Sequence, residues 1–204
     1  MVVPGQRSLF ASGDVVVDRD APWQRLALDD TSWVDVCRNH LLGADTVLDV
    51  LVDSLPWRCG RRFMYDRVVD DPRLTYRAPR PELVPHPVLA LVRDGLAARY
   101  GVTFGMAACN YYRDGRDSVA PHGDRELRDT GDALVAILTL GATRPFRIRP
   151  RGRTGGPTHD VAPGSGDLLV MGGACQRDWE HGVPKVRHAG PRVSVSWRWV
   201  HGSD

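Results

Sequence analysis

The spacing of hydrophobic residues predicts helices in the first half of the chain. From Thr31 to Val52 the apolar positions recur at helical spacing, and Gly43 is expected to divide this stretch into two short helices. A further helix is predicted from Pro87 to Tyr100, with Gly101 ending it. Between them, residues 70–87 contain many prolines, which predicts a surface loop without regular structure.

From Gly101 onward the pattern changes to short apolar runs separated by glycines, which predicts strands joined by turns. The predicted strands are Phe104–Tyr112, Ala133–Leu140, Phe146–Arg149, Asp167–Met171 and Arg192–Val200. Strands that follow a helical start favour an α+β fold with a double-stranded β-helix (jelly roll) core and N-terminal helices packed on one sheet. A chain of 204 residues suffices for one domain over 1–204, with a helical region at 1–100 and the jelly roll at 101–204.

Composition adds constraints on location and redox state. Hydrophobic residues make up 42% and charged residues 25%, as in soluble globular proteins. No apolar run approaches the roughly 18 residues that a membrane span needs, and the first residues do not resemble a signal peptide, so we expect a cytoplasmic protein without membrane contact. The four cysteines form no CxxC pair, which favours reduced, mostly buried thiols.

The charge pattern leaves the partner open. A net charge of +2 argues neither for nor against nucleic acid. The basic residues cluster at alternate positions in one segment, at Arg144, Arg147, Arg149, Arg151 and Arg153. In an extended segment several of these guanidinium groups would share one side. They would form either an edge that contacts phosphates or an ordinary solvated strand and loop.

One short motif has the spacing of a metal site. In His122-Gly-Asp124 the two side chains are two residues apart, so in an extended segment they point to the same side. His181, in the sequence WEHGVP, is the candidate for a third ligand. Two histidines and one carboxylate form the facial triad of non-haem Fe(II) oxygenases, which leaves positions open for an organic acid and O₂.

Two strand segments offer partners for a carboxylate. Arg192-Val-Ser-Val-Ser-Trp-Arg198 alternates so that both arginines lie on one face. Buried arginines require anions, and a dicarboxylate would supply both partners. Asn110 and Tyr112 share a face of another strand and offer an amide and a phenol to the same ligand. Taken alone, the two arginines are equally compatible with a solvated barrel exterior, and Asn110 and Tyr112 are more typical of simple strand packing.

These motifs together resemble the AlkB family of nucleic-acid dealkylases. The run CNYYRDGRDSVAPHGDRE, residues 109–126, is similar to the family segment in which N-x-Y precedes the metal-binding H-x-D. LVAILTLGATRPFRIRP at 134–150 and GDLLVMGGACQRDWEHGVPK at 166–185 resemble the next strand and the segment ending at the distal histidine. RVSVSWR resembles the closing R-x(5)-R motif, so the order matches from about residue 105 to 200.

The resemblance implies a role for each residue of these motifs. The implied iron ligands and catalytic residues are His122, Asp124 and His181; Arg192 with Tyr112 would hold the distal carboxylate of 2-oxoglutarate, and Arg198 with Asn110 its C1 end. The implied substrate contacts are Glu126 and, in a nucleotide-recognition lid within residues 1–100, Tyr65, Arg67, Arg73 and Tyr76. The segment after Tyr76 is shorter and richer in proline than the family's usual lid.

The implied activity is oxidative dealkylation of N1-methyladenine or N3-methylcytosine in DNA or RNA. It would use Fe(II), 2-oxoglutarate and O₂, would release an aldehyde, succinate and CO₂, and would be carried out by a monomer in DNA alkylation repair. A 2-oxoglutarate-dependent hydroxylase of a protein or small molecule shares all the metal and cosubstrate residues and stays an alternative. A non-catalytic metal-binding jelly roll or a zinc hydrolase is a weaker one, because neither needs a pair of arginines for a dicarboxylate.

Overall fold

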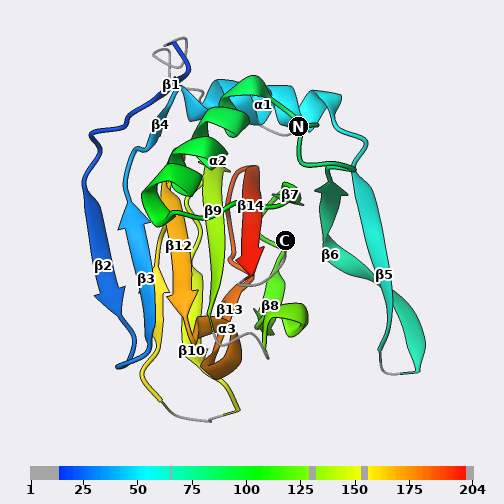
Figure 1. Ribbon diagram of the computed structural model, residues 1–204. Helices are drawn as coiled ribbons and strands as arrows, with labels where there is room; N and C mark the ends of the chain where they lie inside the picture. Colours follow the sequence, from blue (N-terminus) through cyan, green and yellow to red (C-terminus); the bar gives the residue numbers. More distant parts are fainter. Residues whose placement is uncertain (1–13, 65, 129–131, 153–155, 201–204) are drawn as a thin grey trace.

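The computed structural model describes residues 14–64, 66–128, 132–152 and 156–200. Most strands belong to one antiparallel sheet of eight strands (Figure 1). Its order is β2 (Trp23–Ala27), β3 (Ser32–Cys37), β12 (Leu168–Gly173), β9 (Ala133–Gly141), β14 (Arg192–Val200), β7 (Ala108–Tyr112), β6 (Arg67–Arg77) and β5 (Arg58–Met64).

A second sheet of four strands completes the core. Its order is β11 (His159–Val161), β10 (Phe146–Pro150), β13 (Trp179–Val183) and β8 (Val119–His122). The remaining elements are the pair β1 (Val16–Val17) and β4 (Leu41–Leu42), helices α1 (Ala44–Ser54), α2 (Pro87–Tyr100) and α3 (Cys175–Asp178), and the 3-10 turn η1 (Arg125–Leu127). Within the described residues, no helix combines the length and the apolar character needed to cross a membrane.

The central strand β9 is apolar at nearly every position because both of its faces are covered. Its residues Leu134, Ala136, Leu138 and Leu140 pack into one hydrophobic cluster with the buried side chains of α1 and α2. The alternate residues Ala133, Val135 and Ile137 point to the opposite face and join a second cluster with apolar side chains of β10 and β13. This is the side-chain period of two expected of a strand, and it defines an outer, helix-covered face and an inner face toward the small sheet.

Strand β14 uses the same period to separate core from site. Val193, Val195 and Trp197 are fully buried in the helix-covered cluster. Arg192, Ser194, Ser196 and Arg198 alternate with them and therefore lie on the inner face.

The sequence predicted α2 with its bounds. His86 accepts a hydrogen bond from the backbone N–H of Val88 at 3.2 Å, and Gly101 ends the helix at a φ of 66°. This is a helix with a side-chain N-cap and a left-handed glycine at its end. Along this helix Leu89 is fully buried, whereas Leu91 is 53% exposed.

The predicted helix over Thr31–Val52 is wrong in its first part. Residues 32–37 form strand β3 between β2 and β12, and only the part after Gly43 is helical, as α1. Val34 and Val36 are β-branched and pack on a pleated surface, which favours the strand over the helix. The described part of residues 1–100 therefore contains six strands as well as two helices, which corrects the expectation of a helical region.

The prediction that prolines exclude regular structure after residue 70 is wrong as well, because β6 passes through Pro72 and continues to Arg77. Pro72 lies where the pairing of β5 with β6 shifts register, between Asp70 and Leu74, so its missing N–H costs no ladder hydrogen bond. Its carbonyl accepts a hydrogen bond from the N–H of Ser118 at 2.7 Å, which ties the hairpin to the loop before β8.

Candidate active site

A cavity of about 810 Å³ lies on the inner face, between the large and the small sheet. The predicted site residues that line it are Arg73, Tyr76, Asn110, Tyr112, His122, Asp124, Glu126, His181 and Arg198. They come from β6, β7, β8, η1, β13 and β14 and from the segment after β8. The fold therefore brings together residues that are more than 120 positions apart in the sequence.

The two predicted metal-binding histidines face each other across neighbouring strands. β8 and β13 are paired antiparallel, and His122 is directly opposite His181. Their ring centroids are 4.6 Å apart, and Phe146 stacks on His181 at 5.4 Å. Gly182 follows His181, and a Cβ there would lie 2.8 Å from the carbonyl oxygen of Val119. The absence of a side chain at this position therefore lets the two strands approach.

Asp124 follows β8 and turns toward the same histidines. Its Oδ1 lies 4.0 Å from Nε2 of His122, and its backbone N–H donates to Oε1 of Gln176 at 3.0 Å. Its Oδ2 accepts a hydrogen bond from Nε of Arg198 at 2.7 Å. Burial would raise the pKa of Asp124, but the Arg198 guanidinium outweighs it and holds the pKa below its ordinary value. The carboxylate is thus ionised at neutral pH.

Both imidazoles are in states suited to metal binding. Burial, with the neighbouring His122, lowers the pKa of His181 to about 3, so this ring is neutral. Nδ1 of His122 lies 2.9 Å from the carbonyl oxygen of Ala120; a hydrogen bond donated there leaves Nε2 as the free lone pair.

Arg192 is the most unusual side chain of the inner face. It is fully buried, and its Nη2 donates a hydrogen bond to Oγ1 of Thr139 at 3.2 Å. Its Nε and Nη1 have no partner among the described residues. Its Cζ lies 5.2 Å from the centre of the Tyr112 ring. A buried guanidinium with two unused donors fits a site for an anion.

Asn110 and Arg198 are already held in place. Oδ1 of Asn110 accepts a hydrogen bond from Nε of Arg73 at 2.9 Å, which links the cosubstrate residues to the hairpin β5–β6. Arg198 contacts Asp124, as above, and its Nη1 donates to Oγ of Ser196 at 3.4 Å. Ser196 in turn donates to the carbonyl oxygen of Ala108 at 3.1 Å.

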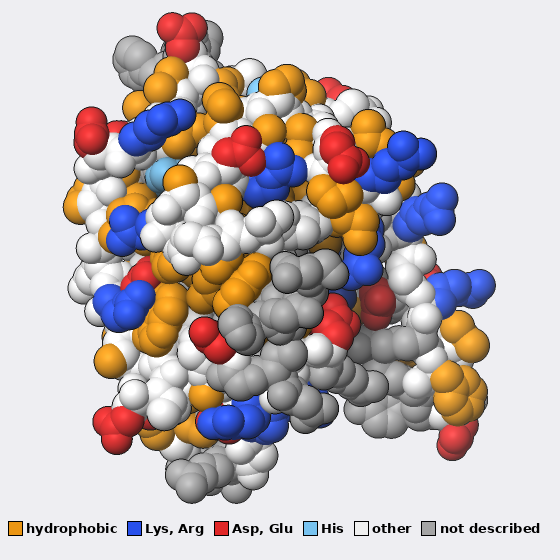
Figure 2. Space-filling view, in the orientation of Figure 1, with side chains coloured by type: hydrophobic (Ala, Val, Ile, Leu, Met, Phe, Trp, Pro, Cys, Tyr) orange, Lys and Arg blue, Asp and Glu red, His pale blue; other side chains and the backbone are white. Residues whose placement is uncertain are grey.

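Only some of the predicted substrate contacts line the cavity. Arg73, Tyr76 and the exposed Glu126 line the cavity, but Arg67 lies exposed at the far end of the hairpin and does not. Tyr65 lies outside the described residues. Figure 2 shows basic, acidic and hydrophobic side chains mixed on the hairpin, which extends away from the body of the molecule.

Sequence reasoning missed two arginines of the lid, Arg58 and Arg77, which also line the cavity. Arg77 lies two and four positions from Thr75 and Arg73 on β6, and Arg58 is paired with Thr75 from β5. The alternation of Arg73, Thr75 and Arg77 was visible in the sequence, but the prolines nearby had excluded a strand there.

The arginine-rich segment does not form a free basic edge. Arg147 and Arg149 do lie on one exposed side of β10, but they pair with Asp160 at 2.9 Å and Glu180 at 3.1 Å. Arg151 donates to backbone carbonyls of Gln176 and Arg177, at 2.8 Å and 2.7 Å. The sequence also gave no sign that Arg144 is fully buried. Arg153 lies outside the described residues.

The comparisons with known proteins point to one family. The model of the 2OG-Fe(II) oxygenase superfamily matches residues 65–198. The human "Alpha-ketoglutarate-dependent dioxygenase alkB homolog 3" is 32% identical over 91% of this chain and 73% of its own length. The human "DNA oxidative demethylase ALKBH2" is 31% identical over 56% of this chain and 46% of its own length. The solved structure of OsALKBH1 matches the fold with a TM-score of 0.61 at 14% identity, over 87% of this chain and 99% of that one.

Proposed function

The chain belongs to the 2OG-Fe(II) oxygenase superfamily and, within it, to the AlkB-like proteins; on that premise we propose that it removes alkyl groups oxidatively from N-alkylated bases in DNA or RNA. The observation that carries the proposal is the cavity in which two opposed histidines and a carboxylate lie near a buried arginine with unused donors. We also propose that the two facing sheets form the double-stranded β-helix of this superfamily, with α1 and α2 on the large sheet.

His122, Asp124 and His181 are the proposed iron ligands. The donor set of two imidazoles and one carboxylate fits Fe(II), and the hydrogen bond of His122 to Ala120 orients its ring with Nε2 toward the site. Fe(II) with 2-oxoglutarate and O₂ supplies the oxidation of an alkyl C–H bond, with succinate and CO₂ as co-products. Arg198 holds one oxygen of Asp124, which leaves the other free to turn toward the histidines.

The cosubstrate is proposed to lie along the inner face of β14. Arg192 and Tyr112 hold its far carboxylate, and Arg198 and Asn110 its C1 end. The fit of Arg192 rests on its complete burial and on N–H groups at Nε and Nη1 that have no partner among the described residues, which suits a guanidinium beside an anion. A metal-binding jelly roll without turnover, or a zinc hydrolase, would leave this guanidinium uncompensated.

The alkylated base is proposed to enter the cavity from the side of β5–β6. N1-methyladenine and N3-methylcytosine are positively charged, so the carboxylate of Glu126 on η1 favours them over the unmodified bases. Arg73 and Tyr76 lie at the same wall and contact the nucleotide. After hydroxylation the alkyl group leaves as an aldehyde, formaldehyde in the case of methyl. A duplex substrate requires flipping of the base, at a cost of a few kcal/mol that single strands largely avoid.

Action on a protein or small molecule stays the alternative, since it uses the same metal and cosubstrate residues. Cytoplasmic location, a monomeric state and a single domain over 1–204 also stay predictions.

The triad is tested by replacing Asp124 with Ala. The matched control is Asp160→Ala, which removes an exposed carboxylate paired with Arg147 on the far side of the small sheet. Each protein is incubated with Fe(II), 2-oxoglutarate and a methylated single-stranded oligonucleotide, and iron content, succinate and methyl loss are measured. We expect Asp124→Ala to lose iron and both products, and Asp160→Ala to retain all three. Full turnover by Asp124→Ala would refute the assignment.

A further inference from the structure

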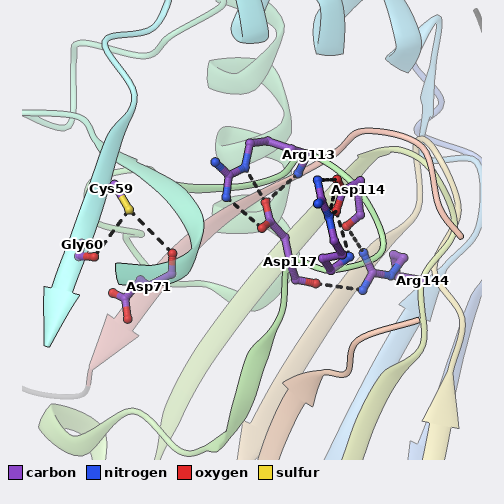
Figure 3. Close-up of polar contacts among 8 residues, drawn as sticks. Cys59, Gly60, Asp71, Arg113, Asp114, Asp117 and Arg144 are labelled. Atoms are coloured by element: carbon purple, nitrogen blue, oxygen red, sulfur yellow. Dashed lines mark hydrogen bonds and ion pairs between the residues drawn. The ribbon is translucent and has the colours of Figure 1, made fainter. Parts of the chain in front are cut away.

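Arg144, like Arg192, is fully buried and is not among the residues that line the cavity. It comes three residues after Gly141, which is paired with Arg192, and its partner loop begins just after Tyr112, which is paired with Arg192 on the other side. It lies between β9 and β10. Its Nη1 donates to the carbonyl oxygen of Asp114 at 3.1 Å, and its Nη2 donates to those of Asp117 and Pro184 at 3.0 Å and 2.7 Å. Figure 3 shows the guanidinium facing the Asp114–Asp117 loop.

These three carbonyls belong to two segments that flank the proposed iron ligands. Asp114 and Asp117 lie in the loop between β7, which carries Tyr112, and β8, which carries His122. Pro184 directly follows β13, which carries His181. Arg144 thus links the loop between β7 and β8 to the residue that follows β13.

Burial lowers the pKa of Arg144 more than the charges of Asp117 and Asp114 raise it, and the carboxylates of both are bound by other arginines. The carboxylate of Asp117 is bound in bidentate fashion by Arg113, at 2.8 Å and 2.9 Å, and that of Asp114 is bound by Arg116 at 2.7 Å. Figure 3 shows Arg113 and Arg144 on opposite sides of Asp117. Arg144 instead contacts neutral carbonyls, and its Nε has no partner among the described residues.

The two buried arginines also act on each other. Burial lowers the pKa of Arg192, and the positive charge of Arg144 lowers it further. Burial likewise lowers the pKa of Arg144, while Tyr112 raises it. Two like charges in a medium of low dielectric repel and are costly to bury, unless an anion lies beside them. Three nitrogens of this pair, Nε of Arg144 and Nε and Nη1 of Arg192, have no hydrogen-bond partner among the described residues. They are therefore available to an anion.

We infer that Arg144 is a positioning residue for the 2-oxoglutarate cosubstrate: it fixes the Asp114–Asp117 loop around Arg192 and adds a second buried positive charge behind the far carboxylate. This inference rests on the proposed function. The far carboxylate is then attracted electrostatically by both guanidinium groups, although only Arg192 contacts it. The site consequently favours a dicarboxylate over a 2-oxo acid with an uncharged end.

The test separates charge from structure with three variants. Arg144→Gln removes the charge, Arg144→Lys keeps it but cannot span three carbonyls, and Arg113→Gln disrupts the same loop away from Arg192. Binding of 2-oxoglutarate is titrated calorimetrically with Mn²⁺ in place of iron, and Tm is recorded for each protein. Turnover is not needed for either readout.

We expect all three variants to lower Tm. Only Arg144→Gln should weaken 2-oxoglutarate binding, by about tenfold, the scale of one charge-assisted interaction. Arg144→Lys and Arg113→Gln should stay within about threefold of the unmodified protein. Equal weakening by Gln and Lys, or an unchanged Kd in Arg144→Gln, would overturn the inference. If the unmodified protein binds no 2-oxoglutarate, the proposed function fails instead.

A second measurement needs only the lysine variant, in case Arg144→Gln does not fold. A buried ammonium loses its proton far more readily than a guanidinium. The affinity of Arg144→Lys for 2-oxoglutarate should therefore fall relative to the unmodified protein as pH rises from about 7 to 10. A ratio of affinities that is constant over this range would contradict a role for the charge.

Discussion

Replacing Arg192 with Met should separate the stability of the protein from its cosubstrate affinity. Met has a similar length and no charge, so the buried volume is nearly kept. The arginine donates a hydrogen bond to Thr139 at 3.2 Å, and its Nε and Nη1 have no partner among the described residues. A buried arginine without an anionic partner is costly, so an anion at this place would stabilise it.

The two effects have opposite signs. Losing the hydrogen bond to Thr139 costs about 1 kcal/mol, while removing an uncompensated buried charge relieves a penalty of several kcal/mol. The ligand-free variant should therefore be at least as stable as the unmodified protein. Losing the partner of a buried carboxylate costs about 2–5 kcal/mol of binding. That corresponds to a roughly thirty-fold to several-thousand-fold weaker Kd for 2-oxoglutarate.

Urea denaturation without ligand gives the free energy of unfolding, and calorimetric titration with Mn²⁺ gives the Kd. Arg147→Met, which breaks an exposed pair with Asp160, is the matched control and should change both values little. An Arg192→Met protein that is clearly less stable and still binds 2-oxoglutarate normally would refute the account, because Arg192 would then be a structural residue.

Four further predictions concern the scaffold and the strand pair that carries the two histidines. Leu138→Ala, in the fully buried centre of β9, should lower the free energy of unfolding by about 2–5 kcal/mol in urea denaturation; a loss below 1 kcal/mol would contradict the packing described. Burial would raise the pKa of Asp29, but hydrogen bonds, chiefly from Trp179, lower it from 3.8 to about 2. A depressed carboxyl pKa stabilises the fold above the unfolded value, and this stability is lost as pH falls from about 4 to about 2; Asp29→Asn should lose less over that range in acid titrations followed by circular dichroism. Gly95→Ala, on α2 with open space around it, should raise stability by about 0.5–1 kcal/mol. Gly182→Ala should push β8 from β13 and weaken Mn²⁺ binding, and normal metal affinity in that variant would argue against the opposed histidines as ligands.

The sequence predicted the second half of the chain better than the first. β14 and α2 were predicted with their bounds, because a strand buried on one face and a capped helix leave clear local patterns. β3 was mistaken for a helix, because its identity depends on the neighbours β2 and β12 rather than on its own spacing. β6 was missed because its proline falls at a register shift that only the pairing with β5 reveals.

In the site, too, features with a local sequence pattern were predicted and features that depend on distant contacts were not. The spacing of His122 and Asp124 and the alternation of Arg192 and Arg198 indicated the chemistry, and the structure places three of these four in one cavity wall with His181. The burial of Arg144 could not be predicted, because its partners are backbone carbonyls from two distant segments.

The central claim is tested most directly by the reaction itself. Purified protein is incubated with Fe(II), ascorbate and single-stranded DNA or RNA carrying N3-methylcytosine or N1-methyladenine, with and without 2-oxoglutarate. Methyl loss is read by mass spectrometry, and succinate and formaldehyde are quantified in parallel. The account predicts demethylation only with 2-oxoglutarate, with one succinate and one formaldehyde for each methyl lost. Succinate without demethylation would keep the dioxygenase assignment and exclude these substrates. If folded, iron-loaded protein formed neither succinate nor demethylated product, the proposed function would be contradicted.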